Sequence, residues 1–227
     1  MYENHERGFL DFRKLLSPKS PNSPVVEKRI TNIGGVPTHK VELDATTKAF
    51  HIPSWKDLSE KERMQMLRKI AQEAGRDPRI ATLAVQILKN AGVQPRDYRG
   101  QAAAILKWVQ TNIYYVNEPG ERLQDPIYTL KVKYGDCDDL ALLFAALCES
   151  IRLPWRFVLS GKGRFGVERW IEGTPEKDIQ FSHIYAAVGW PPFNPKYWAY
   201  AEPTLKGVDL GWDVVSHMQK TGGLVLP

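Results

Sequence analysis

Two residues of the sequence, Cys137 and His183, are of the types that carry out nucleophilic acyl transfer. Cys137 begins an apolar run that predicts a helix over residues 137–151. A thiol at the start of a helix faces the positive end of the helix dipole and unpaired backbone N–H groups, which lower its pKa. Asp138 and Asp139 act in the opposite sense, because nearby negative charge raises the pKa of a thiol. A reactive Cys137 therefore requires that these carboxylates point away or that an imidazolium lies nearby.

The second cysteine, Cys148, lies in the middle of the same predicted helix. Its apolar neighbours indicate that it packs in the core as a small hydrophobic residue. The two cysteines are eleven residues apart, or about 16 Å along a helix axis, which excludes a disulfide between them. Both thiols are therefore expected to be free, as in a reducing compartment.

His183 lies in a run, residues 181–188, whose composition predicts a strand. With the two-residue period of a strand, His183 shares one face with Phe181, Tyr185 and Ala187. A histidine among aromatic side chains is often structural, so the pattern alone leaves a structural and a catalytic interpretation open.

Glu202 follows the next predicted strand, residues 197–201. If this strand pairs antiparallel with that of His183, Glu202 can lie beside the imidazole and orient its ring. The chain would then supply a thiol, a base and an orienting acid in the order Cys137, His183, Glu202, which is the arrangement of nucleophilic acyl-transfer sites.

Several ordered segments carry a resemblance to a known family. They are the nucleophile segment 135–139, the apolar segment 153–158, the histidine segment 182–185, the acid segment 198–204 and its sequel 210–212. Together they resemble transglutaminase-like domains of the papain-like cysteine peptidase superfamily. They are similar in particular to versions found in structural gene clusters of tailed phages and prophages. The resemblance implies an α+β fold in which the nucleophile helix packs on an antiparallel sheet.

The resemblance also implies roles for individual residues. Cys137, His183 and Glu202 would form the catalytic triad, although the family's third residue is usually aspartate. The extra methylene of glutamate changes the reach of the carboxylate, so Asp209 and Asp213 are reserve candidates. The oxyanion would be bound by the backbone amide of Cys137 or by the side chain of Gln124. Four aromatic residues would either pack in the core or line a groove for the acyl group: Trp108, Tyr114, Tyr115 and Trp198.

The elements that must position these residues change along the chain. Residues 1–50 are expected to be an extended arm with a Pro/Ser-rich linker at 17–24 and two strand-like runs around Gly34-Gly35. Residues 51–98 predict a helical segment, with helices over about 59–75 and 77–91 marked by Ser59 and Asp77 as caps. Residues 99–227 predict the catalytic domain, which begins with a helix near 101–112. Helices followed by strands indicate an α+β protein.

Composition excludes several classes of function. The chain has 227 residues, a net charge of +5 and 25% charged residues, with the basic side chains scattered, so no specific nucleic-acid contact is expected. The start of the sequence has no signal-peptide pattern, and no apolar run is long enough for a membrane span. Asp136, Asp138 and Asp139 resemble the start of a calcium loop, but apolar residues follow where oxygen ligands are required. No metal and no cofactor is expected.

The sequence thus predicts a thiol-dependent enzyme that hydrolyses or transfers amide bonds, made in the cytoplasm, with peptidoglycan or virion proteins as substrates if the phage resemblance holds. Two alternatives stay open. The protein can be a cross-linking transglutaminase, because the sequence does not decide between water and an amine as acceptor. It can also be a virion structural or assembly protein that contacts other virion proteins through its N-terminal arm, with a vestigial or auxiliary site.

Overall fold

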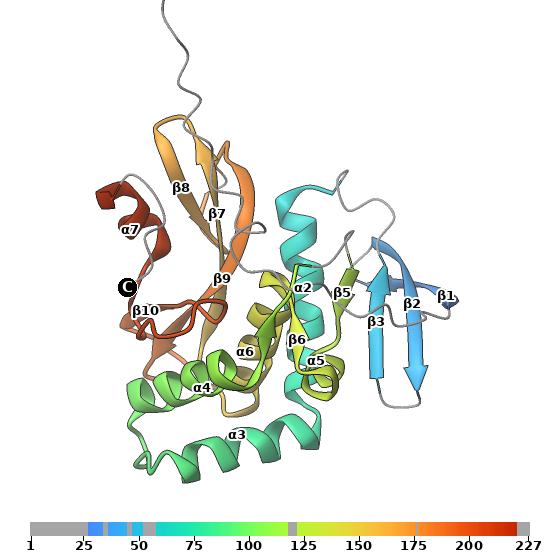
Figure 1. Cartoon of the computed structure of the whole chain (residues 1–227), viewed down its shortest axis with the longest axis horizontal. Helices are drawn as coiled ribbons and strands as arrows, with labels where there is room; N and C mark the ends of the chain where they lie inside the picture. The colour runs from blue at the N-terminus through green and yellow to red at the C-terminus, as the bar shows by residue number, and fades with distance from the viewer. Residues whose placement is uncertain are drawn as a thin grey trace, which may run out of the picture.

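The computed structural model of the chain describes residues 27–33, 36–44, 47–51, 58–117, 122–175 and 177–221. These residues combine helices with an antiparallel curled sheet, so the predicted α+β class is confirmed (Figure 1). The predicted Pro/Ser-rich linker at 17–24 lies outside the described residues. Among the helices that are described, none is long and apolar enough to cross a membrane.

Three helices precede the nucleophile helix: α2 (Glu60–Gly75), α3 (Pro78–Asn90) and α4 (Tyr98–Asn112). The predicted capping box begins α2, because Ser59 accepts from the backbone N–H of Glu62 while the Glu62 carboxylate accepts from that of Ser59. Asp77 caps α3 as predicted. Asp97 caps α4, which therefore begins slightly before its predicted start.

A group of short elements leads into the nucleophile helix: β4 (Tyr114–Tyr115), β5 (Arg122–Gln124), α5 (Pro126–Val132) and β6 (Tyr134–Gly135). The parallel pairing of β4 with β6 brings Tyr115 beside Gly135, two residues before Cys137. Helix α5 was not among the predicted helices. Its start is nevertheless readable, because Asp125 caps the helix and Pro126 follows it, the same signature that begins α3.

The nucleophile helix α6 (Cys137–Ser150) packs on a four-stranded sheet of order β10-β9-β7-β8. Figure 1 shows α6 between this sheet and α2. The strands are β7 (Trp155–Gly163), β8 (Gly166–Ile171), β9 (Gln180–Trp190) and β10 (Tyr197–Ala201), all antiparallel to their neighbours. Residues 140–148 are all buried in the main core, which explains why this helix is apolar on every side.

An irregularity in β9 changes the predicted face of one residue. Along the pairing with β7, Gly161 is opposite Phe181 and Ser160 is opposite His183, so Ser182 is an extra residue in β9. Such a bulge reverses the alternation of side chains. Phe181 accordingly packs against the main core and near Trp170, whereas His183 stacks on Tyr185. The predicted common face of Phe181 and His183 is therefore wrong, while that of His183 and Tyr185 is confirmed.

The other face of the sheet is covered by the C-terminal part of the chain. Helix α7 (Val214–Thr221) contributes Val214, Val215 and Met218 to a second apolar cluster, which also contains Tyr185 and Ala187 of β9. This helix was not predicted from the sequence. The sheet is thus packed on both faces, by α6 on one and by α7 with the preceding loop on the other.

The N-terminal strands form a separate four-stranded sheet of order β1-β2-β3-β5. The predicted hairpin is present as β1 (Glu27–Ile33) paired antiparallel with β2 (Val36–Asp44). Strand β3 (Thr47–His51) straddles the predicted domain boundary at residue 50 and pairs with β5. The N-terminal strands are thereby joined by main-chain hydrogen bonds to the segment that precedes the nucleophile.

Candidate active site

Cys137 occupies the first turn of α6 and is partly exposed, whereas Cys148 is buried. Asp136 caps the helix by accepting from the backbone N–H of Asp138 at 3.3 Å. The backbone N–H of Asp136 in turn donates to Asp139 at 3.3 Å, which completes a capping box. Burial raises the pKa of the Cys148 thiol, so this thiol is protonated at neutral pH. Cys148 is fully buried, which confirms that it packs in the core.

His183 and Glu202 form a buried pair. The distance from His183 Nε2 to Glu202 Oε2 is 2.7 Å, and the two residues are 3% and 0% exposed. The pairing of β9 with β10 matches Ala201 with Ala186, so Glu202 follows opposite Tyr185 and its side chain reaches His183, two residues away along β9. The strands of His183 and Glu202 are therefore antiparallel neighbours, which is the condition under which Glu202 was expected to lie beside the imidazole.

The environment of His183 favours its protonated form. Burial alone would lower the pKa of His183, but the charge of Glu202 and hydrogen bonds with Cys137 and Glu202 outweigh it and raise this pKa to about 10. Since Nε2 is bonded to Glu202, Nδ1 is the ring nitrogen left for the thiol of Cys137. The three residues thus form one chain of contacts, from thiol to imidazole to carboxylate.

The Glu202 carboxylate is held by more than His183. Its Oε1 accepts from the backbone N–H of Thr204 at 3.1 Å and from the Thr204 hydroxyl at 2.6 Å. The side-chain amide of Gln110 donates to the backbone carbonyls of Glu202 and Val208, both at 3.0 Å. These bonds fix the direction of the carboxylate, whose other oxygen contacts the imidazole of His183.

Gln110 and Thr204 were not identified from the sequence. A signal for Gln110 existed, because it is a polar residue on the apolar side of α4 and is 2% exposed. Buried amides of this kind require hydrogen-bond partners. Thr204 offered only a weak signal, namely a hydroxyl two residues after an acidic residue.

The reserve candidates for the acid do not contact His183 in this way. Asp213 instead accepts from the Tyr185 hydroxyl at 2.9 Å and from Arg169 Nη1 at 2.6 Å. Asp209 is exposed. The structure therefore brings Glu202, and neither of the two aspartates, to the imidazole.

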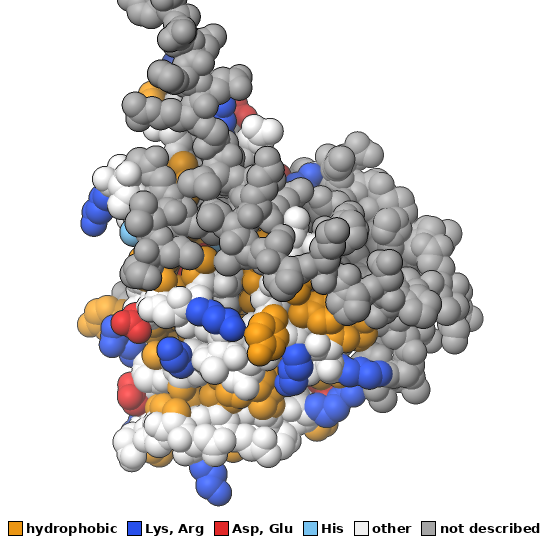
Figure 2. All heavy atoms as spheres, in the orientation of Figure 1, with side chains coloured by type: hydrophobic (Ala, Val, Ile, Leu, Met, Phe, Trp, Pro, Cys, Tyr) orange, Lys and Arg blue, Asp and Glu red, His pale blue; other side chains and the backbone are white. Residues whose placement is uncertain are grey.

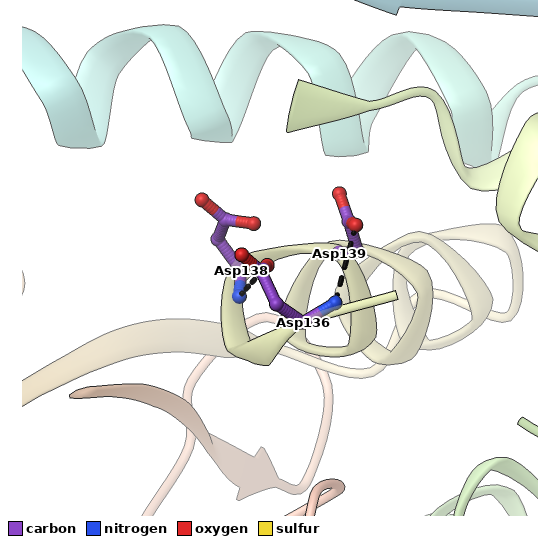
Figure 3. A group of neighbouring side chains, drawn as sticks. All are labelled: Asp136, Asp138 and Asp139. Atoms are coloured by element: carbon purple, nitrogen blue, oxygen red, sulfur yellow. Dashed lines mark hydrogen bonds between the residues drawn. The ribbon is translucent and has the colours of Figure 1, made fainter. Parts of the chain in front are cut away.

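The acidic residues beside Cys137 point away from the sheet that carries His183. Figure 3 shows the Asp138 and Asp139 side chains directed from α6 toward α2. Burial, and after it the charge of Asp136, raises the pKa of the Asp138 carboxyl well above its usual range. A protonated Asp138 places less negative charge beside the thiol.

The three aspartates are also the residues that could bind a cation, because their oxygens lie within 4.8 Å of one another. Two of them already bind main-chain groups: Asp136 caps α6, and Asp139 accepts from Gln124 N at 2.7 Å and from Asp136 N. A metal ion here would have to replace bonds that begin the helix. Those bonds account for the cluster within the described residues.

Gln124, the candidate oxyanion donor, is fully buried. Its backbone N–H binds Asp139, and its side-chain oxygen accepts from the Thr129 hydroxyl at 3.4 Å. Asp139 also accepts from the backbone N–H of Asp136, so these bonds hold the Gln124 backbone beside the start of α6. They tie β5 to α5 and α6.

The aromatic candidates are divided by the structure. Trp198 is opposite Gly189 in the sheet, six residues from His183, or about 20 Å along β9. There it packs under the guanidinium of Arg156 at 4.5 Å, so it is not brought to the site. Trp108 is partly buried against the main core, with Lys133 Nζ 5.4 Å from its ring centre. It therefore flanks the segment that leads to Cys137.

Comparison with known proteins agrees with this architecture. The transglutaminase-like superfamily matches residues 81–195, half of the chain. The protein belongs to the transglutaminase-like superfamily. The match includes Cys137 and His183 and ends before Glu202. No curated protein sequence matches the chain.

Two solved structures resemble the chain more distantly. One is a protein from Cytophaga hutchinsonii provisionally named a cysteine protease, with 17% identity and a TM-score of 0.37 over 72% of this chain and 53% of that one. The other is a provisionally named protease from Parabacteroides distasonis, with 12% identity and a TM-score of 0.40 over 83% of this chain and 40% of that one. The chain thus spans about half the length of these proteins or less, and both scores are too low to support an argument about activity.

Proposed function

We propose that the protein is a cysteine-dependent amidase or peptidase in which Cys137 is the nucleophile, His183 the acid and base, and Glu202 the residue that orients and charges the imidazole. One observation supports this most strongly. A buried carboxylate and a buried imidazole lie 2.7 Å apart, and the imidazole meets a thiol at a helix N-terminus.

The proposed reaction has two halves. The Cys137 thiolate attacks the amide carbonyl, a C–S bond forms, and the backbone N–H groups at the start of α6 stabilise the oxyanion. His183 then gives its proton to the leaving amine as the C–N bond breaks. Water attacks the resulting thioester, His183 takes a proton from it, and the C–S bond breaks to release the acid and the thiolate.

The substrate class is an amide bond of a peptide, and peptidoglycan or a virion protein is the proposed source. Attack by an amine instead of water would give cross-linking by the same residues. Incubation of purified sacculi with the protein tests the peptidoglycan branch. Release of peptides that depends on Cys137 would support it, and intact sacculi would exclude it.

A role in assembly is a second proposal, and the N-terminal sheet supports it. Strands β1 and β2 extend outward from β3, which pairs with β5 of the main body. Within the described residues β1 pairs only with β2, and an unpaired strand edge is suited to pairing with another chain. A chain that begins at Thr47 keeps β3 and lacks the arm. If the arm binds other subunits, this variant has a smaller mass in gel filtration, beyond the loss of its own residues; an unchanged oligomeric state argues against assembly through the arm.

The enzymatic proposal is tested with p-nitrophenyl acetate, which acylates thiols without demanding a particular peptide. The expected result is a burst of nitrophenol with an amplitude close to one per protein, followed by slower turnover. Cys137→Ala abolishes the burst, while Cys148→Ala keeps it. A burst that survives Cys137→Ala would contradict the assignment of the nucleophile.

A further inference from the structure

A buried polar network lies behind the imidazole of His183. Tyr185, two residues further along β9, is fully buried and stacks on His183 with ring centres 5.7 Å apart and planes inclined by 14°. The Tyr185 hydroxyl donates to Asp213 Oδ1 at 2.9 Å. Burial and the Asp213 carboxylate raise the pKa of this hydroxyl, so it remains a proton donor.

Asp213 is fixed by two further elements. Its Oδ2 accepts from Arg169 Nη1 of β8 at 2.6 Å. The same oxygen accepts from the backbone N–H and the hydroxyl of Ser216, a residue in the first turn of α7. Arg169 also lies over the ring of Tyr200 in β10, 4.9 Å from its centre. One carboxylate therefore joins two strands, β8 and β9, to the C-terminal helix, and its partner Arg169 reaches a third strand, β10.

Packing alone does not require this arrangement. A phenylalanine at position 185 would fill the same space with no hydroxyl to satisfy, and burying a hydroxyl and a carboxylate carries a desolvation cost. The hydrogen bond fixes the position of the Tyr185 ring, and the stacked ring limits rotation of the imidazole. This orientation decides whether Nδ1 faces the thiol while Nε2 faces Glu202.

We propose that Asp213 is a positioning residue that acts through Tyr185 to hold the His183 imidazole in register with Cys137, so that helix α7 is part of the catalytic unit. The inference rests on the proposed function. It extends the site beyond the family match, which ends at residue 195. Residues 196–221 would then supply both the acid, Glu202, and the anchor of the base.

Tyr185→Phe is the cleaner test, because it keeps the ring that stacks on His183 and removes only the bond to Asp213. We measure the second-order rate of Cys137 alkylation by iodoacetamide against pH, and kcat and KM for p-nitrophenyl acetate. The expected result is a loss of about tenfold in the alkylation rate at pH 7 and in kcat, with KM nearly unchanged, because a misplaced catalytic group lowers the rate of the chemical step.

Asp213→Asn tests the anchor. Asparagine still caps α7 but has only one oxygen for the four donors that Asp213 binds. The matched control is Asp77→Asn, which alters another aspartate cap that pairs with an arginine, Arg79, at the start of α3. Thermal unfolding is recorded for both. We expect both variants to lower the melting temperature and only Asp213→Asn to lower the alkylation rate at pH 7.

The outcomes separate this inference from the proposed function. If wild type lacks fast, His183-dependent alkylation, the proposed function fails and this inference fails with it. If wild type shows it and Tyr185→Phe keeps the same rate and pH profile, the positioning role alone is overturned. If Asp213→Asn does not fold, Tyr185→Phe decides the question by the same criterion.

Discussion

At the scale of single residues, the proposed chemistry depends most on the pair of His183 and Glu202. Glu202→Gln keeps the size of the side chain and removes the charge that raises the pKa of His183. Burial is then no longer offset, so the imidazole is neutral and the thiolate loses its counter-ion. We expect the alkylation rate of Cys137 at pH 7 to fall by about 30-fold, because a thiol with an unperturbed pKa near 8.5 is only about 3% thiolate at that pH.

The control for that substitution is Glu168→Gln, in the hairpin of β7 and β8. It removes the same charge from a carboxylate that binds the backbone of Phe165. We expect its alkylation rate to equal that of wild type. Equal rates for Glu202→Gln and wild type would remove Glu202 from the triad.

The two cysteines differ in exposure, so their reactions with iodoacetamide can be told apart by mass spectrometry. Cys137 is partly exposed, and Cys148 is buried with its pKa raised by burial. Folded protein treated with iodoacetamide at pH 7 should gain one adduct, at Cys137, and protein in denaturant should gain two. Peptide mapping identifies the site, and modification of Cys148 in the folded protein would contradict the described packing of α6.

At the scale of elements, helix α2 is tied to the sheet by one strong contact. Arg68 Nη2 binds Glu172 Oε2 at 2.7 Å, and the Arg68 guanidinium lies 4.3 Å from the ring centre of Trp155. Glu172 also accepts from the backbone N–H of Phe157. Arg68→Met removes a bidentate pair that is only partly exposed, so we expect the free energy of unfolding to fall by about 1–2 kcal/mol in urea denaturation.

Arg63→Met in the same helix serves as the comparison. Arg63 pairs with Glu60 one turn away at 3.3 Å, and such pairs contribute about 0.2–0.5 kcal/mol. If both variants lose the same small amount, the contact between α2 and the sheet is not a stabilising one.

The elements that the sequence predicted well are those with local signals. Capping residues at Ser59 and Asp77 and the apolar run after Cys137 each determine a helix from neighbouring residues alone. The bulge at Ser182 had no such signal, because it depends on pairing between distant strands. Helix α7 is short, and its cap at Asp213 is recognisable only once Ser216 and Arg169 are seen to converge on it.

The site shows the same division. Cys137, His183 and Glu202 could be selected by type, order and strand pairing, and the structure brings them together. Trp198 was selected because it is aromatic and adjacent to the acid strand. Its place opposite Gly189 follows from the strand register, which composition does not reveal.

For the whole molecule, the expectation of no specific nucleic-acid contact stays a prediction. Figure 2 shows Lys and Arg side chains spread over one face of the molecule, with no single basic patch among the coloured residues. Sequence-independent binding to nucleic acid requires several basic groups close together.

The stability of the whole molecule should decrease as pH rises above neutrality. The pKa of His183 is raised to about 10 in the folded protein, against about 6.5 in an unfolded chain. The folded state therefore binds more protons between these values. The contribution of His183 is fully present below about pH 6.5 and is lost as pH rises toward 10.

Urea denaturation of wild type and His183→Gln at pH 6, 7.5 and 9 measures this dependence. The thiolate of Cys137 offsets this loss until an unfolded thiol titrates near pH 8.5. We therefore expect the free energy of unfolding of wild type to fall mainly above that pH, and that of His183→Gln to fall by clearly less. If the free energy of unfolding depends on pH in the same way in both proteins, the charge of Glu202 does not keep His183 protonated.

The most direct test of the central claim is the rate of Cys137 alkylation by iodoacetamide as a function of pH, in wild type and in His183→Ala. An unperturbed thiol titrates near 8.5, and only the thiolate reacts. The thiol, imidazole and carboxylate described here predict a fast rate with a plateau that extends below about pH 7 and disappears in His183→Ala. A slow rate that rises only near pH 8.5 and is the same in both proteins would contradict an imidazole-coupled nucleophile.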